Sequence, residues 1–128
     1  MFNAFDSYVK RLRSSAKVRK LDFIITRDFL YSLYKKQGGY CALSGIELRW
    51  SAHTKAHRLN CTTASVDRIN SDRGYTEENI QWTHKHLNKM KGTLKQEEFI
   101  KYCRLVARKH NDEDRVSDYM RGVLGFSV

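Results

Sequence analysis

The residues best suited to chemistry lie in one stretch, residues 65–91, which reads SVDRINSDRGYTEENIQWTHKHLNKMK. Asp67 supplies a carboxylate near the end of an expected strand, and Asn88 supplies an amide oxygen on the helix expected after it. Carboxylate and amide oxygens suit Mg²⁺ or Mn²⁺, which keep several water molecules and take phosphate oxygens directly. We therefore expect Asp67 and Asn88 to share one divalent ion that polarises a phosphoryl group.

A polar stripe on the helix expected at residues 83–91 is the second feature. His84, Asn88 and Lys91 follow one another at intervals of four and three residues, so they share one side of a helix. The neighbouring stripe is apolar and is expected to face the core. Packing alone explains such a polar stripe poorly, and we predict that it faces the same site. Lys91 would then hold a neighbouring phosphate.

Arg68 directly follows Asp67, where a histidine would make a ready general base. Arginine stays protonated at physiological pH and cannot abstract a proton from water. It can instead clamp the scissile phosphate or offset charge in the transition state. Another group must then act as the base, and His84 is the first choice. His53 or His57, in the preceding loop, is the alternative.

The elements that position these residues are expected in the order strand, loop, strand, helix. Residues 63–69 have the composition of a strand, and residues 79–82 are expected to pair with it across the loop at 71–78. The helix at residues 83–91 follows. Asn79, at the exit of the loop, is expected to tie the loop to the end of the first strand by hydrogen bonds.

Helices are expected on both sides of this central segment. Apolar residues at helical spacing predict a helix at residues 27–36, with Thr26 as its N-cap. Thr93 and Gln96 form a capping box that predicts a further helix. The combination of a strand pair with flanking helices predicts an α+β fold.

The charge of the chain favours a polyanionic partner. Its 24 Lys and Arg residues against 14 Asp and Glu residues give a net charge of +10 over 128 residues. A balance of this kind is most often found in nucleic-acid-binding proteins. Residues 10–20 are especially basic, and they are expected to form the end of a helix and an arm. That arm can contact the DNA backbone, although a simple solvated charge run is an equally good reading.

The remaining composition bears on the cellular setting. No long apolar run is present, which argues against a membrane partner, and the N-terminus lacks the apolar segment of a secretory signal. The three cysteines are too few and too scattered for a disulfide framework. We therefore expect a cytoplasmic protein with reduced thiols.

Five motifs occur together along the chain. They are C-x-x-S-G from Cys41, S-V-D-R-I-N from Ser65, G-Y-T-x-x-N-I-x-W from Gly74, N-x-x-K from Asn88 and C-x-x-V-A from Cys103. In combination they resemble the HNH endonuclease family, and more narrowly the small HNH proteins of bacteriophages, over residues 30–107. The resemblance implies a ββα-metal core flanked by helices, and hydrolysis of DNA phosphodiesters with a single metal ion.

The resemblance also implies roles for individual residues. It makes Asp67 and Asn88 the ligands of Mg²⁺ or Mn²⁺ and Asn79 the asparagine that fixes the loop. Together with our interpretation of the sequence, this gives a catalytic group of Arg68, Asn79 and His84. The basic residues expected to contact nucleic acid are Arg73, Lys85, Lys89 and Lys91.

The cysteines depart from the family pattern. Many relatives bind a structural zinc through two C-x-x-C pairs, whereas this chain has Ser44 in place of the second cysteine of the first pair. Cys103 likewise has no C-x-x-C partner. A tetrahedral zinc site needs four such ligands, so no structural zinc is expected. Cys41 and Cys103 are expected in the core instead.

These observations lead to one functional expectation and one alternative. Residues 1–25 would form a basic helix or arm, residues 26–110 an HNH nuclease domain, and residues 111–128 a tail that packs on it. The chain would be a metal-dependent endonuclease that nicks or cuts DNA. The alternative is an inactive nucleic-acid-binding protein that kept the fold and lost the base. A second copy of the chain or another phage protein is a further candidate partner, in the host cytoplasm if a phage encodes the chain.

Overall fold

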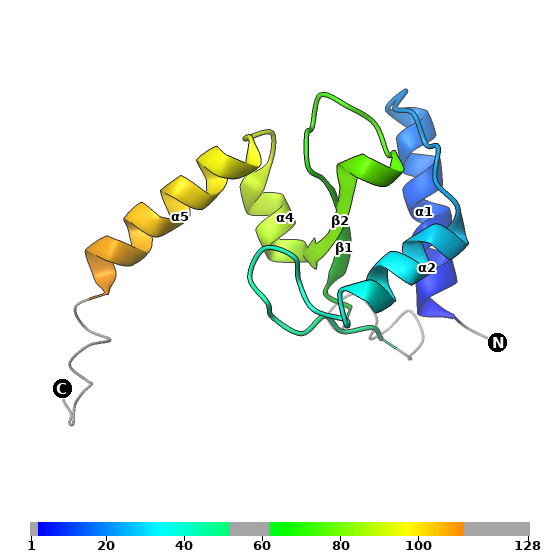
Figure 1. Ribbon diagram of the computed structural model, residues 1–128. Helices are drawn as coiled ribbons and strands as arrows, with labels where there is room; N and C mark the ends of the chain where they lie inside the picture. The colour runs from blue at the N-terminus through cyan, green and yellow to red at the C-terminus, as the bar shows by residue number, and fades with distance from the viewer. Residues whose placement is uncertain (1–2, 52–61, 112–128) are drawn as a thin grey trace. The chain divides into compact units, whose positions relative to one another are not determined.

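The computed structural model describes residues 3–51 and 62–111 of the chain (Figure 1). Within them the fold is α+β, as predicted, with four α-helices and a two-stranded antiparallel sheet. The chain forms two compact units, Met1–Thr93 and Leu94–Val128. The described helix near the N-terminus therefore belongs to the same unit as the sheet, and the boundary between the units precedes the helix at residues 96–110.

The sheet is a hairpin of β1 (Ala64–Arg68) and β2 (Ile80–His84), with the short 3₁₀ helix η1 (Glu77–Asn79) leading into β2. The register runs from Ala64 opposite His84 to Arg68 opposite Ile80. Because side chains alternate along a strand, Asp67 lies on the opposite face of the sheet from its neighbour Arg68. Both predicted strands are present, and β2 ends two residues later than expected.

Helix α4 (Lys85–Lys91) follows β2 directly and is shorter than the predicted helix. Thr83 and His84, which were expected in its first turn, pair instead with Ser65 and Ala64 of β1. His84 has extended backbone angles and is the N-cap of α4, where its ring accepts a hydrogen bond from the backbone N–H of His86. Pairing with β1 thus places these two residues in β2 instead of in the helix.

Helices α1 (Ala4–Val18) and α2 (Arg27–Lys36) lie on the other side of the hairpin from α4 (Figure 1). α2 has the predicted bounds, and the side chain of Thr26 accepts a hydrogen bond from the backbone N–H of Phe29 as an N-cap. α1 buries Val9 and Ala16 in the core. Most of the basic segment at residues 10–20 is therefore a packed helix rather than an arm.

Trp82 joins the hairpin to both of these helices. Its side chain is fully buried, and its indole Nε1–H donates to the backbone oxygen of Leu30 in α2 at 2.9 Å. Four further aromatic rings lie with their centroids less than 6 Å from that of Trp82: Phe5, Tyr8, Tyr34 and Trp50. Trp82 and Tyr75 are thus both buried residues of the core.

The segment between α1 and α2, residues 19–26, binds the loop of the hairpin through backbone hydrogen bonds. The backbone N–H of Tyr75 donates to the oxygen of Asp22 at 2.8 Å, and that of Ile24 donates to the oxygen of Tyr75 at 2.9 Å. A Cβ atom on Gly74 would lie 2.7 Å from the backbone oxygen of Asp22. Glycine is therefore needed at position 74 for the two backbones to approach so closely.

Helix α5 (Gln96–His110) is the element described in the second unit. Its N-cap is Lys95, without a side-chain hydrogen bond, so the capping box predicted from Thr93 is wrong. Cys103 is exposed on α5 rather than in a core, whereas Cys41 is buried as predicted. The predicted packing of the tail falls on residues 112–128, outside the described residues. Neither α5 nor any other described helix is long and apolar enough to cross a bilayer.

We predict that Gly74→Ala lowers the free energy of unfolding by about 1 to 3 kcal/mol, because the new methyl group forces the Asp22 and Tyr75 backbones apart. Asp72→Ala, an exposed change in the same loop, should stay within about 0.5 kcal/mol of the wild type. Urea unfolding measures both. Equal stability of the two variants would contradict the close approach.

Candidate active site

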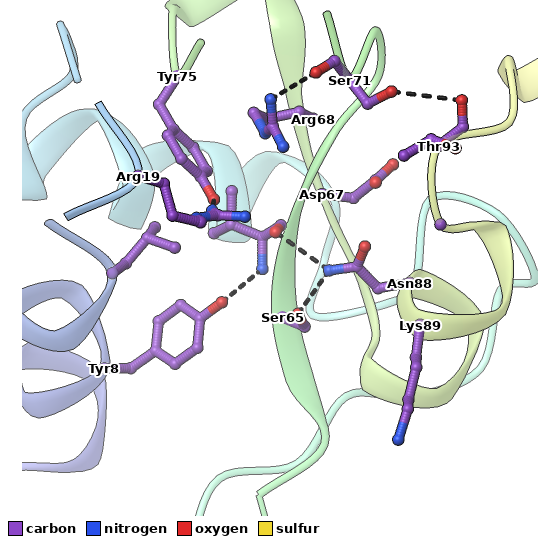
Figure 2. A pocket seen from close by; sticks show the side chains of 13 residues that line it. Tyr8, Arg19, Ser65, Asp67, Arg68, Ser71, Tyr75, Asn88, Lys89 and Thr93 are labelled. Carbon is purple, nitrogen blue, oxygen red and sulfur yellow. Dashed lines mark hydrogen bonds between the residues drawn. The ribbon is translucent and has the colours of Figure 1, made fainter. Parts of the chain in front are cut away.

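A cavity of about 390 Å³ opens between α1, the hairpin and α4 (Figure 2). Asp67, Arg68, Asn88 and Lys89, four of the residues predicted for the site, line it. Other predicted site residues do not: Arg73, Asn79, His84, Lys85 and Lys91. The cavity thus gathers the two predicted metal ligands and separates them from the predicted base.

Asp67 is almost fully buried beneath this cavity, with 3% of its surface exposed. Its Oδ1 atom lies 3.2 Å from the ammonium nitrogen of Lys91, and its Oδ2 accepts a hydrogen bond from Gln81 Nε2 at 2.9 Å. Burial of a carboxylate without such partners would be very unfavourable. Lys91 and Gln81 therefore offset the cost of burying Asp67 and fix its orientation.

Lys91 has a different position from the one predicted. Its side chain is fully buried, and its ammonium group donates to Asp67 Oδ1 at 3.2 Å, to the Arg68 oxygen at 3.0 Å and to the Ile69 oxygen at 3.4 Å. These acceptors occupy all three donors of an ammonium group. The predicted contact of Lys91 with a phosphate is wrong, because the charge faces inward and holds the end of β1.

Asn88 ties α4 to the free edge of β1. Its Nδ2 donates to Ser65 Oγ at 2.7 Å and to the backbone oxygen of Val66 at 3.2 Å. Tyr8, in α1, contacts the same strand: its Oη accepts a hydrogen bond from the backbone N–H of Val66 at 2.8 Å. Burial raises the pKa of Tyr8, so its phenol stays neutral. The Asn88 Oδ1 atom makes no hydrogen bond to the described residues, and it points to the side of the cavity where Asp67 lies (Figure 2).

Asp67 and Asn88 fit the oxygen-rich coordination of Mg²⁺ or Mn²⁺, with water and substrate oxygens completing the shell. Each carboxylate oxygen can accept two interactions, so Asp67 retains capacity beside Lys91 and Gln81. The described residues contain no group of three or more His, Cys, Asp or Glu side chains placed to hold a metal. Because the Lys91 ammonium opposes a second cation nearby, we expect weak binding that substrate phosphate strengthens.

His84 lies away from these ligands. It pairs with Ala64, at the opposite end of β1 from Asp67, and it does not line the cavity. Its Nδ1 accepts the N-cap hydrogen bond from His86 at 3.2 Å. Desolvation, together with electrostatic repulsion from His86 and Lys85, lowers the pKa of His84. The predicted placement of His84 one turn before Asn88 on a shared helical stripe is wrong, and the geometry does not support it as the base.

Asn79 makes the hydrogen bonds predicted for the loop. It is 2% exposed, and its Oδ1 accepts from the backbone N–H of Asn70 at 2.9 Å. Its Nδ2 donates to the backbone oxygens of Asn70 at 3.0 Å and Gly74 at 2.9 Å. These bonds span the loop between the strands. Any direct part of Asn79 in catalysis stays a prediction.

Arg68 fastens the same loop from the cavity side. Its Nη1 donates to the backbone oxygens of Ser71 at 2.7 Å and Arg73 at 2.8 Å, and its guanidinium lies 5.5 Å from the centre of the Tyr75 ring. A histidine has neither the length nor the donors for this pair of contacts. Arg68 thus has a structural role, and it also lines the cavity.

Of the other basic residues predicted to contact nucleic acid, Lys89 lines the cavity, whereas Arg73 and Lys85 do not. Arg73 forms an exposed ion pair with Glu78 at 3.1 Å. Lys89 is exposed, and its side chain points away from Asp67 in Figure 2, while Lys85 is half-buried. Their contacts with nucleic acid stay predictions. The alternative bases His53 and His57, and also Cys61, lie outside the described residues.

Arg19 is a charged residue of the cavity that the sequence did not single out for the site. It follows α1 directly, and its Nη2 donates to Tyr75 Oη at 2.8 Å across 56 positions of sequence. In the sequence it was one of several charges in the basic segment at residues 10–20. No local spacing connects it with Tyr75, so only the packing of α1 on the hairpin reveals the pair.

No family model, no curated protein and no solved structure matches this chain. The resemblance to the HNH family therefore rests on the motifs of the chain.

We predict that Lys91→Met lowers the free energy of unfolding by about 3 to 5 kcal/mol, because it leaves the Asp67 carboxylate buried without its cation. Lys89→Met, the same change at an exposed position of α4, should change it by less than about 0.5 kcal/mol. Adding Asp67→Asn to Lys91→Met should restore part of the loss. Urea unfolding measures all three, and equal effects of the two single changes would refute the buried pair.

A pH dependence follows from the lowered pKa of His84. The unfolded chain binds more protons than the folded chain just below the usual histidine value of 6.5, so stability falls as the pH falls through that window. His84→Asn keeps an acceptor at the N-cap and removes the titration. Unfolding free energies between pH 7.5 and about 5 should therefore decline less in the variant. Identical profiles would contradict the shift.

Proposed function

We propose that this chain is an HNH-type, metal-dependent endonuclease that hydrolyses DNA phosphodiester bonds, with β1, β2 and α4 as its ββα-metal core. One observation carries the proposal: the Asp67 carboxylate and the unbonded Asn88 oxygen line the same cavity as the guanidinium group of Arg68. Oxygen ligands beside a fixed cation suit a phosphodiester, whose charge needs compensation. The motifs at Ser65, Gly74 and Asn88 support the family assignment.

The roles of the residues follow from their contacts. Asp67 and Asn88 would hold the divalent ion, which supplies charge stabilisation at the phosphate and the leaving oxygen. Lys91 keeps Asp67 in place, and Arg68 binds a phosphate oxygen with the donors that the loop does not use. Among the described residues no histidine lines the cavity, so we assign no protein base.

DNA binding itself would depend largely on charge. The net charge of +10 favours the phosphate backbone of any sequence, and binding of this kind weakens steeply as salt rises. The exposed residues Lys89 and Arg73, near the cavity and its loop, extend the basic surface. We therefore propose contacts to the DNA backbone with little selection among bases.

The second candidate function is a catalytically inactive HNH-fold protein that binds nucleic acid. Two observations favour it. The carboxylate of Asp67 is already neutralised by Lys91, and the described cavity contains no histidine. Such a protein would bind DNA in a salt-dependent way without needing a divalent ion.

We predict nicking or cutting of supercoiled plasmid with Mg²⁺ or Mn²⁺ and none with EDTA. Asp67→Asn should reduce the rate by at least about 100-fold, because the metal loses its only carboxylate ligand among the lining residues. His84→Asn should retain the activity, because His84 lies outside the cavity. Agarose gels follow both variants, and thermal unfolding verifies that each is folded.

Asp72→Asn is the matched control, since it makes the same substitution at an exposed position of the neighbouring loop. It should cleave like the wild type, and its purification in parallel excludes contaminating nucleases. If no divalent ion supports cleavage while salt-sensitive DNA binding persists, the endonuclease proposal fails and the inactive binding protein replaces it.

A further inference from the structure

Two guanidinium groups approach one tyrosine at the wall of the cavity. Arg19 donates to Tyr75 Oη at 2.8 Å, and the guanidinium carbon of Arg68 lies 5.5 Å from the centre of the Tyr75 ring. Tyr75 is buried, with 4% of its surface exposed. Figure 2 shows both arginine side chains directed to this tyrosine from different elements. Tyr75 thus contacts two like charges, one at its hydroxyl group and one at its ring.

The charge of this pair is not balanced within the described structure. Neither Arg19 nor Arg68 forms a salt bridge with a described residue. Asp67 is the one carboxylate among the lining residues, and the ammonium of Lys91 already neutralises it. Two like charges in a partly enclosed space repel each other, and an anion bound between them would relieve the repulsion.

Both guanidinium groups keep donors for such an anion. Arg68 uses Nη1 for the loop, and Arg19 uses Nη2 for Tyr75, while their other nitrogens make no hydrogen bond to the described residues. The planar fork of arginine matches the oxygens of a phosphate group, which can accept two parallel hydrogen bonds. The free donors therefore favour phosphate over a simple halide ion.

The backbone at Arg19 is held in position as well. Its backbone N–H donates to the oxygen of Ser15 at 3.0 Å, and the N–H of Leu21 donates to the oxygen of Ala16 at 2.8 Å. Lys20, between them, has a positive φ of 59°. These bonds close the end of α1 and reverse the chain. Because the backbone is fixed before a ligand binds, little ordering is needed on binding.

We propose that Arg19 and Arg68 form a phosphate clamp, which binds a backbone phosphate of the nucleic acid beside the group at Asp67 and Asn88. The clamp makes α1 a wall of the site instead of a separate basic arm. This inference deepens the proposed function and rests on it for the identity of the ligand. Phosphate binding by the clamp needs neither a metal ion nor cleavage, so the two can be tested separately.

The test measures the dissociation constant of a short DNA duplex in EDTA, where no cleavage occurs. Arg19→Gln should weaken binding about tenfold and lower the salt slope by about one, as expected for the loss of one phosphate contact. Arg13→Gln is the matched control, because it removes the same charge from an exposed position of α1 outside the cavity. It should weaken binding by less than about twofold.

A second variant tests whether the hydroxyl group of Tyr75 holds Arg19 in place. Tyr75→Phe keeps the ring beneath Arg68 and removes the hydroxyl that holds Arg19. It should weaken binding less than Arg19→Gln does, and the double variant should bind no worse than Arg19→Gln alone. Additive losses in the double variant would show that the hydroxyl does not act through Arg19, and would overturn the clamp.

Inorganic phosphate identifies the ligand chemistry. At constant ionic strength it should compete with DNA on the wild type more strongly than on Arg19→Gln, and equal competition on both would overturn the clamp. Equal losses from Arg19→Gln and Arg13→Gln would also overturn it, since they would reflect general charge alone. A selective effect of Arg19→Gln without any metal-dependent cleavage would support the clamp and refute the endonuclease. Metal-dependent cleavage with no selective effect of Arg19→Gln on binding would support the endonuclease and refute the clamp.

Discussion

The buried ion pair of Lys91 and Asp67 is the interaction on which the site depends. The ammonium group contacts the Asp67 carboxylate and the backbone oxygens of Arg68 and Ile69. One side chain at the end of α4 thus holds the C-terminal end of β1. A buried carboxylate needs such a partner, and a buried ammonium needs all three acceptors. The positions of Asp67 at the cavity and of Arg68 above the loop both follow from this contact.

The same pair sets the charge of the cavity. Because Lys91 neutralises Asp67 from within, the half-buried Arg68 and the exposed Arg19 leave positive charge at the cavity. The loop is also fixed by Arg68, which contacts Ser71 and Arg73, and by Asn79, whose hydrogen bonds reach Asn70 and Gly74. The fixed loop, the internal ammonium group of Lys91 and the guanidinium groups of Arg19 and Arg68 all suit the nucleic-acid backbone that we propose as the ligand. This holds whether or not hydrolysis follows binding.

Local patterns in the sequence predicted much of this fold. Thr26 and helical spacing gave the bounds of α2, and both strands were placed within two residues of their ends. The hydrogen bonds of Asn79 were also expected from its place at the loop exit. The prediction failed where helix and strand competed for the same residues. Thr83 and His84 fit a helical stripe, but pairing with β1 across the hairpin decides their conformation.

The sequence by itself determined the α+β class, the hairpin followed by a helix, the basic character and the presence of Asp67 and Asn88 near one another. These depend on short-range spacing, composition and turn chemistry, which a single chain displays. Only the tertiary structure decided the direction of each polar side chain: Lys91 turns inward, His84 lies away from the cavity, and Arg19 reaches it from the end of α1. The direction of a charged side chain depends on partners that are distant in sequence, and local sequence patterns do not reveal those partners.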